Sequence, residues 1–298
     1  MTALAQQRPE QGAAPESVRP APSRFWRTLR RSRLAIPGGL VVLLYILLAV
    51  AAPWVATHDP LQANLSATLL PPSTQNWFGT DELGRDVFSR VIYGARLSLA
   101  EGLVAVGLAL AIGVPIGLVS GYVGGRWDMV VMRLVDVLMA FPGVLLAVVI
   151  ISILGASLMN AMIAVAIYTV PIFTRLARAS TLSVKEEPYI EACRATGLTH
   201  TRILVRHVLP NIARPILVMA ALRIAIAILT ASGLSFLGLG AQPPSPEWGA
   251  MLANGRNYVL LAPHMVIFPG CAIVLLVFGL NLFQEGLSLA LDPREAER

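Results

Sequence analysis

Long apolar runs separated by polar segments dominate the hydropathy pattern of the chain. Six of these runs approach the roughly 20 residues that a helix needs to cross a bilayer core of about 30 Å. They lie at 34–56, 97–120, 134–154, 158–177, 214–233 and 263–284. A short turn near Gly155 separates the third run from the fourth, which predicts a helical hairpin. The pattern therefore predicts an all-α membrane protein with six transmembrane helices.

The composition agrees with a chain that has little water-facing surface. Hydrophobic residues make up 56% of the sequence and charged residues only 13%, whereas soluble domains carry about 25% charged residues. The four histidines are scattered without metal-ligand spacing, so no metal site is predicted. The two cysteines, Cys193 and Cys271, fall in a polar segment and in an apolar run, and no disulfide is expected.

The basic residues indicate how the chain is oriented in the membrane. Of the 23 Lys and Arg residues, 18 fall on one side of the predicted spans and 4 on the other, while Arg223 lies within a span. Cytoplasmic loops are enriched in Lys and Arg, so both termini are expected in the cytoplasm. Since the charge excess is explained by orientation, no nucleic-acid partner is expected.

The spans divide the chain into five parts. The N-terminal tail is expected to be partly disordered, and its basic end to bind membrane lipid. The predicted parts are a cytoplasmic tail at 1–33, a first helix at 34–56, an extracytoplasmic loop at 57–96, a five-helix core at 97–290 that includes a cytoplasmic loop at 178–213, and a cytoplasmic tail at 291–298.

The cytoplasmic loop is predicted to hold two short helices. Pro188 suits a first helical position and Gly197 a helix stop. Between them one face joins an aromatic residue to small ones, Tyr189, Ala192, Cys193 and Thr196. A second helix is predicted between Thr199 as N-cap and Pro210 as terminator. A partner-binding helix pair and a membrane-surface hairpin are both compatible with this pattern.

The extracytoplasmic loop has two interpretations. Asp81, Glu82, Arg85 and Asp86 are expected either to form local ion pairs or to present a surface to an extracytoplasmic partner. Further on, the prolines around Trp248 exclude regular helix or central strand. Irregular backbone of this kind must lie outside the hydrocarbon or be buried in protein, and Trp248 is expected at the membrane interface.

Ionisable residues inside the spans are candidates for function because they are costly in a bilayer. Arg223 lies about ten residues into its span, where it is expected either to face a translocation path and meet a substrate carboxylate, or to snorkel or pair with a partner subunit. Glu101 is expected to be solvated near the outer end of its span. Asp136 is expected to pair with Arg133, three residues earlier.

The chain has no catalytic motif of its own. Its one lysine, Lys185, is not part of a G-x-x-x-x-G-K-[ST] phosphate-binding loop. Neither H-E-x-x-H nor G-x-S-x-G occurs. The chain is therefore predicted not to be an enzyme, and any ATP-driven process must use a separate ATPase subunit.

The segment EACRATGLTHTRILVRHVLP, 191–210, resembles the EAA loop of ABC-importer permeases. Glu191, Ala192, Gly197, Leu209 and Pro210 match that motif, while Cys193 and His207 depart from it. The resemblance implies that this loop docks in a groove of the ATPase subunit. The residues it assigns to the docking surface are Tyr189, Glu191, Ala192, Cys193, Gly197, Leu209 and Pro210.

Four further segments resemble the dipeptide, oligopeptide and nickel class of these permeases, closest to its C-type subunit. They are WFGTDELGRDVFSRVIYGARLSL at 77–99, MRLVDVLMAFPG at 132–143, LSFLGLGAQPPSPEWGAML at 234–252 and LDP at 291–293. The resemblance implies a type I importer permease of the bacterial inner membrane that forms half of a peptide pathway, for di- or oligopeptides or glutathione. A nickel-chelate permease, an ion-gradient secondary transporter and a membrane scaffold remain alternatives.

The partners implied by the resemblance are a second homologous permease subunit, two ATPase subunits that carry ATP and Mg²⁺, and an extracytoplasmic binding protein. No cofactor is expected on this chain itself. The contact with the binding protein is assigned to Asp81, Arg85, Asp86 and Trp248.

Overall fold

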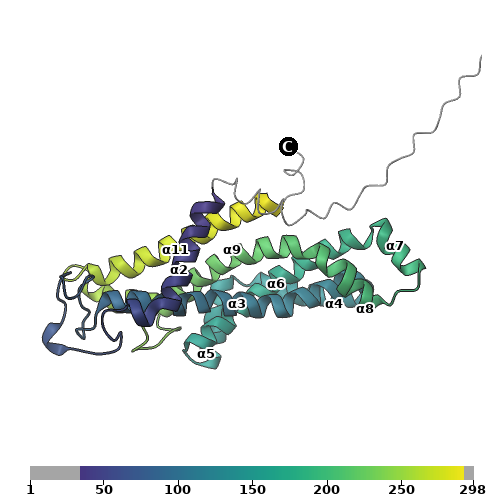
Figure 1. Cartoon of the computed structure of the whole chain (residues 1–298). Helices are drawn as coiled ribbons and strands as arrows, with labels where there is room; N and C mark the ends of the chain where they lie inside the picture. Colours follow the sequence, from purple (N-terminus) through teal and green to yellow (C-terminus); the bar gives the residue numbers. More distant parts are fainter. Residues whose placement is uncertain (1–33, 292–298) are drawn as a thin grey trace, which may run out of the picture.

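The computed structural model describes residues 34–291. The predicted tails, 1–33 with its lipid-binding end and 292–298, lie outside the described residues. The helices are α2 (Ala35–Val55), α3 (Val87–Val123), α4 (Gly125–Ala140), α5 (Gly143–Leu154), α6 (Leu158–Lys185), α7 (Pro188–Ala195), α8 (His200–Ile203), α9 (Leu209–Phe236), α10 (Trp248–Gly255) and α11 (His264–Leu291). Figure 1 shows α7 and α8 at one end, here called the α7 end, and residues 56–86 at the other, the loop end.

Five helices among the described residues are long and apolar enough to cross a membrane, and the third predicted span is a broken pair. The prediction of one continuous helix at 134–154 is wrong, because α4 and α5 meet at an angle of 91°. Phe141 at the break is extended, with ψ of 136°. Pro142 disfavours helical backbone at the residue before it, which explains the bend. The chain thus has six spans only if the bent pair counts as one.

The second span begins earlier than the hydropathy pattern predicted. Helix α3 starts at Val87 rather than 97, because the side chain of Asp86 accepts a hydrogen bond from the Ser89 N–H and caps the helix. Its first turns carry Arg90 and Arg96, and these charges lower the mean hydropathy, so the first turns were not predicted as part of the span. The loop between α2 and α3 is therefore confined to 56–86, and the loop between α6 and α9 to 186–208.

Glycines allow α3 and α6 to lie directly against each other. A Cβ at Gly113, Gly117 or Gly121 would overlap the backbone of α6 at Val170, Thr174 or Arg178 respectively. Small residues four apart permit such close backbone approach in membrane proteins. Because the residue numbers of the contacting positions increase together in α3 and α6, the two helices run in the same direction. The bent α4–α5 pair makes the return crossing between them.

Helices α2 and α11 pack antiparallel through a second set of glycines. Gly38 contacts the backbone at Phe283, and Gly286 contacts Ala35 at the start of α2. The start of α2 and the end of α11 therefore lie on the same side of the helix bundle. Together with α10 and the start of α3 they enclose one apolar core, while α3, α6 and α9 enclose another. Both cores meet along α9 and α3.

Candidate functional site

Helix α7 begins and ends where the sequence predicted. Pro188 is its first residue, where the missing N–H costs nothing. At the other end Gly197 has φ of +78°. The Gly197 N–H donates to the Arg194 carbonyl at 3.0 Å, and the Leu198 N–H donates to the Cys193 carbonyl at 3.2 Å. This is a Schellman motif, which favours glycine at that position.

One face of α7 is presented to the surroundings. Ile190 is fully buried and is the one buried residue of the helix. Tyr189, Glu191 and Ala192 are exposed and Cys193 is half-buried. The predicted face of an aromatic residue beside small ones is therefore outward, held in place by a single apolar anchor.

Tyr189 also ties α7 to the start of α9. Asn211 donates to the Tyr189 hydroxyl at 3.1 Å. Partial burial raises the pKa of Tyr189, and the nearby charge of Glu187 acts in the same direction. The hydroxyl is therefore neutral at physiological pH and available as a hydrogen-bonding group beside the exposed face.

The second short helix does not stop at Pro210. Helix α8 passes into a π-helical turn at Leu204–Val208 and then directly into α9. Thr199 precedes α8 as predicted, although its side chain makes no capping bond. Pro210 is the second residue of α9 and follows the π-helical turn directly, so its prediction as a terminator is wrong. Pro210 is exposed and Leu209 half-buried.

The charged residues of the loop end form a buried network. Arg85 Nε donates to Asp81 Oδ2 at 2.6 Å, and Arg85 Nη2 donates to Glu82 Oε1 at 3.0 Å. Arg90 Nε lies 3.5 Å from the same Asp81 oxygen. The interpretation as local ion pairs is confirmed for Asp81, Glu82 and Arg85, whereas Asp86 lies 3.8 Å from His58 Nδ1 and pairs with no Lys or Arg within residues 34–291.

Asp86 joins three segments of this loop. Its Oδ2 atom accepts hydrogen bonds from the Ser89 N–H at 2.8 Å and from the Thr57 hydroxyl at 3.1 Å. Its Oδ1 atom accepts one from Asn76 at 2.9 Å. The carboxylate therefore caps α3 and fixes the loop against the end of α2.

Trp248 is fully buried rather than at the membrane interface, so that prediction is wrong. Its indole N–H donates to the Val91 carbonyl at 3.0 Å. The ring packs on Gly94, where a Cβ would overlap it, and it lies edge-on to Tyr45 with ring centroids 5.8 Å apart. Trp248 thus joins α10 to α3 and α2.

The four side chains predicted to contact a binding protein are therefore interior. Asp81, Arg85, Asp86 and Trp248 are each at most 4% exposed. They hold the backbone of the loop end in place, and none of them offers its side chain to another molecule. Contact with an extracytoplasmic partner has to come from the exposed residues around them.

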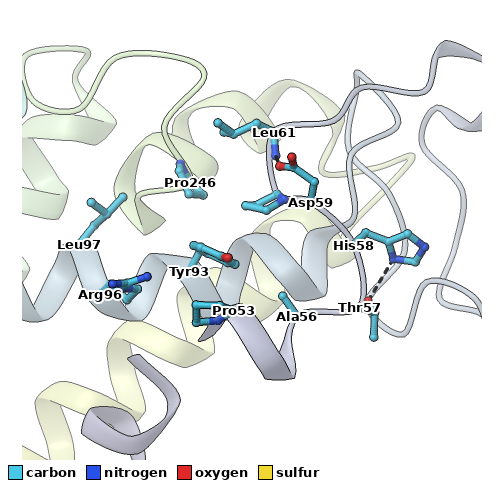
Figure 2. A pocket seen from close by; sticks show the side chains of 11 residues that line it. Pro53, Ala56, Thr57, His58, Asp59, Leu61, Tyr93, Arg96, Leu97 and Pro246 are labelled. Atoms are coloured by element: carbon cyan, nitrogen blue, oxygen red, sulfur yellow. Dashed lines mark hydrogen bonds between the residues drawn. The ribbon is translucent and has the colours of Figure 1, made fainter. Parts of the chain in front are cut away.

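A cavity of about 640 Å³ opens on the loop end (Figure 2). Tyr93 and Arg96 reach it from α3, Pro53 from α2 and Pro246 from the segment before α10. The remaining lining residues are Ala56, Thr57, His58, Asp59, Pro60, Leu61 and Leu97. Arg96 and Asp59 are both exposed there, so the cavity combines apolar walls with one positive and one negative charge.

Two charged residues of the spans differ from expectation. Asp136 pairs with Arg175 of α6 at 2.5 Å, not with Arg133, because the bend after α4 sets α4 against α6. Glu101 is completely buried, not solvated, and both its oxygens lack a hydrogen-bond partner among residues 34–291. The apolar neighbours of Glu101 in the sequence gave no signal of either property.

Arg223 is half-buried in α9. Its Nε atom is enclosed, yet has no hydrogen-bond partner within the described part of the chain. Among residues 34–291, no hydrogen bond or ion pair joins Arg223 to another predicted site residue. Over the same residues, no group of three or more His, Cys, Asp or Glu side chains is placed to hold a metal ion.

A short exposed helix between two long helices is what the resemblance to ABC-importer permeases implied, and the comparison with protein families identifies that class. The family model described as "Binding-protein-dependent transport system inner membrane component" matches residues 113–296, and "N-terminal TM domain of oligopeptide transport permease C" matches residues 23–72. The chain belongs to the family of inner-membrane components of binding-protein-dependent transport systems.

Individual relatives are similar over nearly the whole chain. The dipeptide transport system permease protein DppC of Alkalihalophilus pseudofirmus is 48% identical over 90% of this chain and 88% of its own length. The glutathione transport system permease protein GsiD of Escherichia coli O157:H7 is 47% identical over 94% of this chain and 93% of its own. The inward-facing MetNI methionine ABC transporter shares the fold, with a TM-score of 0.54, 20% identity, and coverage of 68% of this chain and 96% of that one.

Proposed function

We propose that this permease takes up peptides, in the range from dipeptides to glutathione, across the bacterial inner membrane at the expense of ATP. It forms half of the translocation path, and a second homologous permease forms the other half. Support for the substrate class comes from the dipeptide and glutathione relatives at 47–48% identity over most of the chain.

The observation that carries the ATP-driven mechanism is the exposed face of α7. Glu191 and Ala192 are exposed, and the Schellman turn at Gly197 sets where the helix ends. Such a face fits a groove on an ATPase subunit, with Tyr189, Cys193, Leu209 and Pro210 around it. Two ATPase subunits then supply ATP and Mg²⁺, and the α7 end together with both termini is cytoplasmic.

The loop end is then extracytoplasmic and receives the binding protein. Asp81, Arg85, Asp86 and Trp248 serve this contact from inside, by fixing the loop that carries it. Arg223 is proposed to face the translocation path and to meet a substrate carboxylate, because its enclosed Nε atom has no hydrogen-bond partner within residues 34–291. Arg223→Gln is expected to weaken uptake of peptides with a free carboxylate while the complex still assembles.

The test is co-purification joined to transport. The tagged chain is extracted in mild detergent, its partners are identified by mass spectrometry, and the complex with its binding protein is reconstituted for uptake of labelled dipeptide and glutathione. The loop-broken variant Gly197→Pro with Glu191→Arg is compared with Glu186→Arg, which changes an exposed charge of the same loop outside α7.

The proposal expects an ATPase and a second permease with the native chain and with Glu186→Arg, and loss of the ATPase from the loop-broken variant. Uptake should require ATP. A chain that purifies alone in a host that encodes its partners, and whose flux follows an ion gradient, would instead be a secondary transporter. Competition of uptake by a nickel chelate but by no peptide would indicate a nickel-chelate permease.

A further inference from the structure

The last turn of α3 carries an aromatic ring toward α7 and α8, which are here called the coupling helices. Tyr122 lies one residue before the end of α3, and the chain then turns at Gly124, with φ of +70°. Helix α3 has 37 residues, which makes it about 55 Å long at 1.5 Å per residue. It is long enough to run from the loop end to the α7 end without interruption.

Two side chains from the coupling helices converge on this ring. The Tyr122 hydroxyl and His200 Nδ1 of α8 share a hydrogen bond of 2.9 Å, and the two rings meet edge to face at 5.7 Å. From α7, the Arg194 guanidinium carbon lies 5.5 Å from the centre of the Tyr122 ring. A cation at this distance from an aromatic ring is attracted to its face.

The coupling helices are also attached to α9 and to the core: α8 continues into α9, and Asn211 of α9 donates to the Tyr189 hydroxyl of α7. Ile190 of α7 and Ile203 of α8 are fully buried in the core that α3, α6 and α9 enclose. Within residues 34–291, the hydrogen bond of Tyr122 with His200 is the one that joins α3 to the segment of α7 and α8. The isoleucines therefore hold the helices to the bundle, and Tyr122 gives α3 a polar, directional contact with both of them.

The far end of α3 is fixed to the loop end. Asp86 caps its first turn and binds Thr57 and Asn76 of the loop, and the Val91 carbonyl accepts the Trp248 indole N–H. A displacement of α3 along its axis must therefore move the loop that carries the extracytoplasmic surface. One continuous helix thus connects the two surfaces at which partners are proposed to bind.

We propose that Tyr122 is a positioning residue, which transmits the movement of α7 and α8 to α3 through His200 and Arg194. This inference rests on the proposed function, because it needs an ATPase that moves α7. It goes further by naming a second contact, outside the docking face itself, on which the coupling of ATP hydrolysis to transport depends.

The experiment measures uptake per ATP hydrolysed in the reconstituted complex with its binding protein and labelled peptide. Tyr122→Phe removes the hydroxyl and keeps the ring, His200→Ala removes the partner, and Tyr122→Leu removes both polar contacts. Tyr258→Phe is the matched control, because it deletes the hydroxyl of a half-buried tyrosine that makes no hydrogen bond within residues 34–291. ATPase content is measured for every variant by co-purification.

The ATPase should co-purify with all variants, since Ile190 and Ile203 are untouched. Uptake per ATP should fall about three- to tenfold in Tyr122→Phe, as expected for the loss of one net hydrogen bond, and further in Tyr122→Leu. The double variant Tyr122→Phe with His200→Ala should be no worse than the worse of its singles, because both remove the same contact.

Three results would overturn the inference. One is unchanged uptake per ATP in Tyr122→Phe and His200→Ala with the ATPase bound. Another is loss of the ATPase from Tyr122→Phe but not from the native chain, which would make Tyr122 part of docking. If the native chain itself binds no ATPase, the proposed function fails and this inference fails with it.

Discussion

Glu101 should reduce the stability of the protein, and replacing it with leucine should raise the free energy of unfolding. Its side chain is completely buried in α3, both of its oxygens lack a hydrogen-bond partner within residues 34–291, and so does the Ser98 hydroxyl one turn earlier. Leucine has a similar size and no polar atom, so Glu101→Leu removes two unsatisfied acceptors and leaves little empty space.

The expected gain follows from the cost of an unsatisfied buried group. That cost is about 1–3 kcal/mol for a neutral group and more for a charged one. Replacing buried charged groups by apolar residues of similar volume is often stabilising by about 1–4 kcal/mol. Glu101→Leu is therefore expected to add about 2 kcal/mol to the free energy of unfolding, and Glu101→Gln, which keeps two polar atoms, to add less.

The assay is reversible unfolding of the purified protein in detergent, followed by far-ultraviolet circular dichroism. Glu285→Leu is the control, because Glu285 lies on the exposed side of α11 and surface changes are usually within about 0.5 kcal/mol. A loss of stability of more than about 1 kcal/mol in Glu101→Leu would refute the reasoning. It would mean that a bound ion or ordered water satisfies the carboxylate in the native protein.

Three further substitutions test the packing and the buried acid of the loop end. Gly117→Leu should prevent α3 and α6 from closing, because even a Cβ overlaps the Thr174 carbonyl; size-exclusion chromatography should show aggregated protein. Trp248→Phe should lower the free energy of unfolding by about 2–4 kcal/mol, because it leaves a void and removes the hydrogen bond from the indole N–H to the Val91 carbonyl. Burial raises the pKa of Glu247 above 4.5, so the folded state holds this proton more tightly than the unfolded state does. The stabilisation of the folded state by this proton is complete below pH 4.5 and is lost as the pH rises through the pKa of Glu247 in the folded state. The thermal unfolding temperature should fall less with rising pH in Glu247→Gln than in the native chain.

Hydropathy and turn residues were sufficient for most of the fold. The apolar runs located every long helix, and Pro188 with Gly197 located α7, because these signals are local. The break at Pro142 was missed because the apolar run continues across it and hydropathy does not register backbone geometry. The early start of α3 was missed for the opposite reason, since its first turns carry charged residues, of which Arg90 is buried and Arg96 exposed.

The burial of the charged side chains at the loop end could not be predicted from the sequence. Asp81, Arg85 and Asp86 are hydrophilic in any scale, and a surface role was as consistent with their pattern as an ion pair. Which of the two holds depends on partners such as Asn76, Thr57 and Arg90, and on the enclosure of the whole loop. These contacts join positions up to about 30 residues apart, so no periodicity records them.

This difference changes how substitutions at the two ends must be interpreted. At the α7 end an exposed residue such as Glu191 can be changed without disturbing the core, so loss of transport in Glu191→Arg reports on a partner. At the loop end Asp81→Asn removes the negative charge closest to the buried guanidinium of Arg85, and breaking a buried ion pair costs about 3–5 kcal/mol. Loss of transport in that variant would therefore reflect a displaced loop, and it identifies a contact with the binding protein only if the variant retains the stability of the native chain.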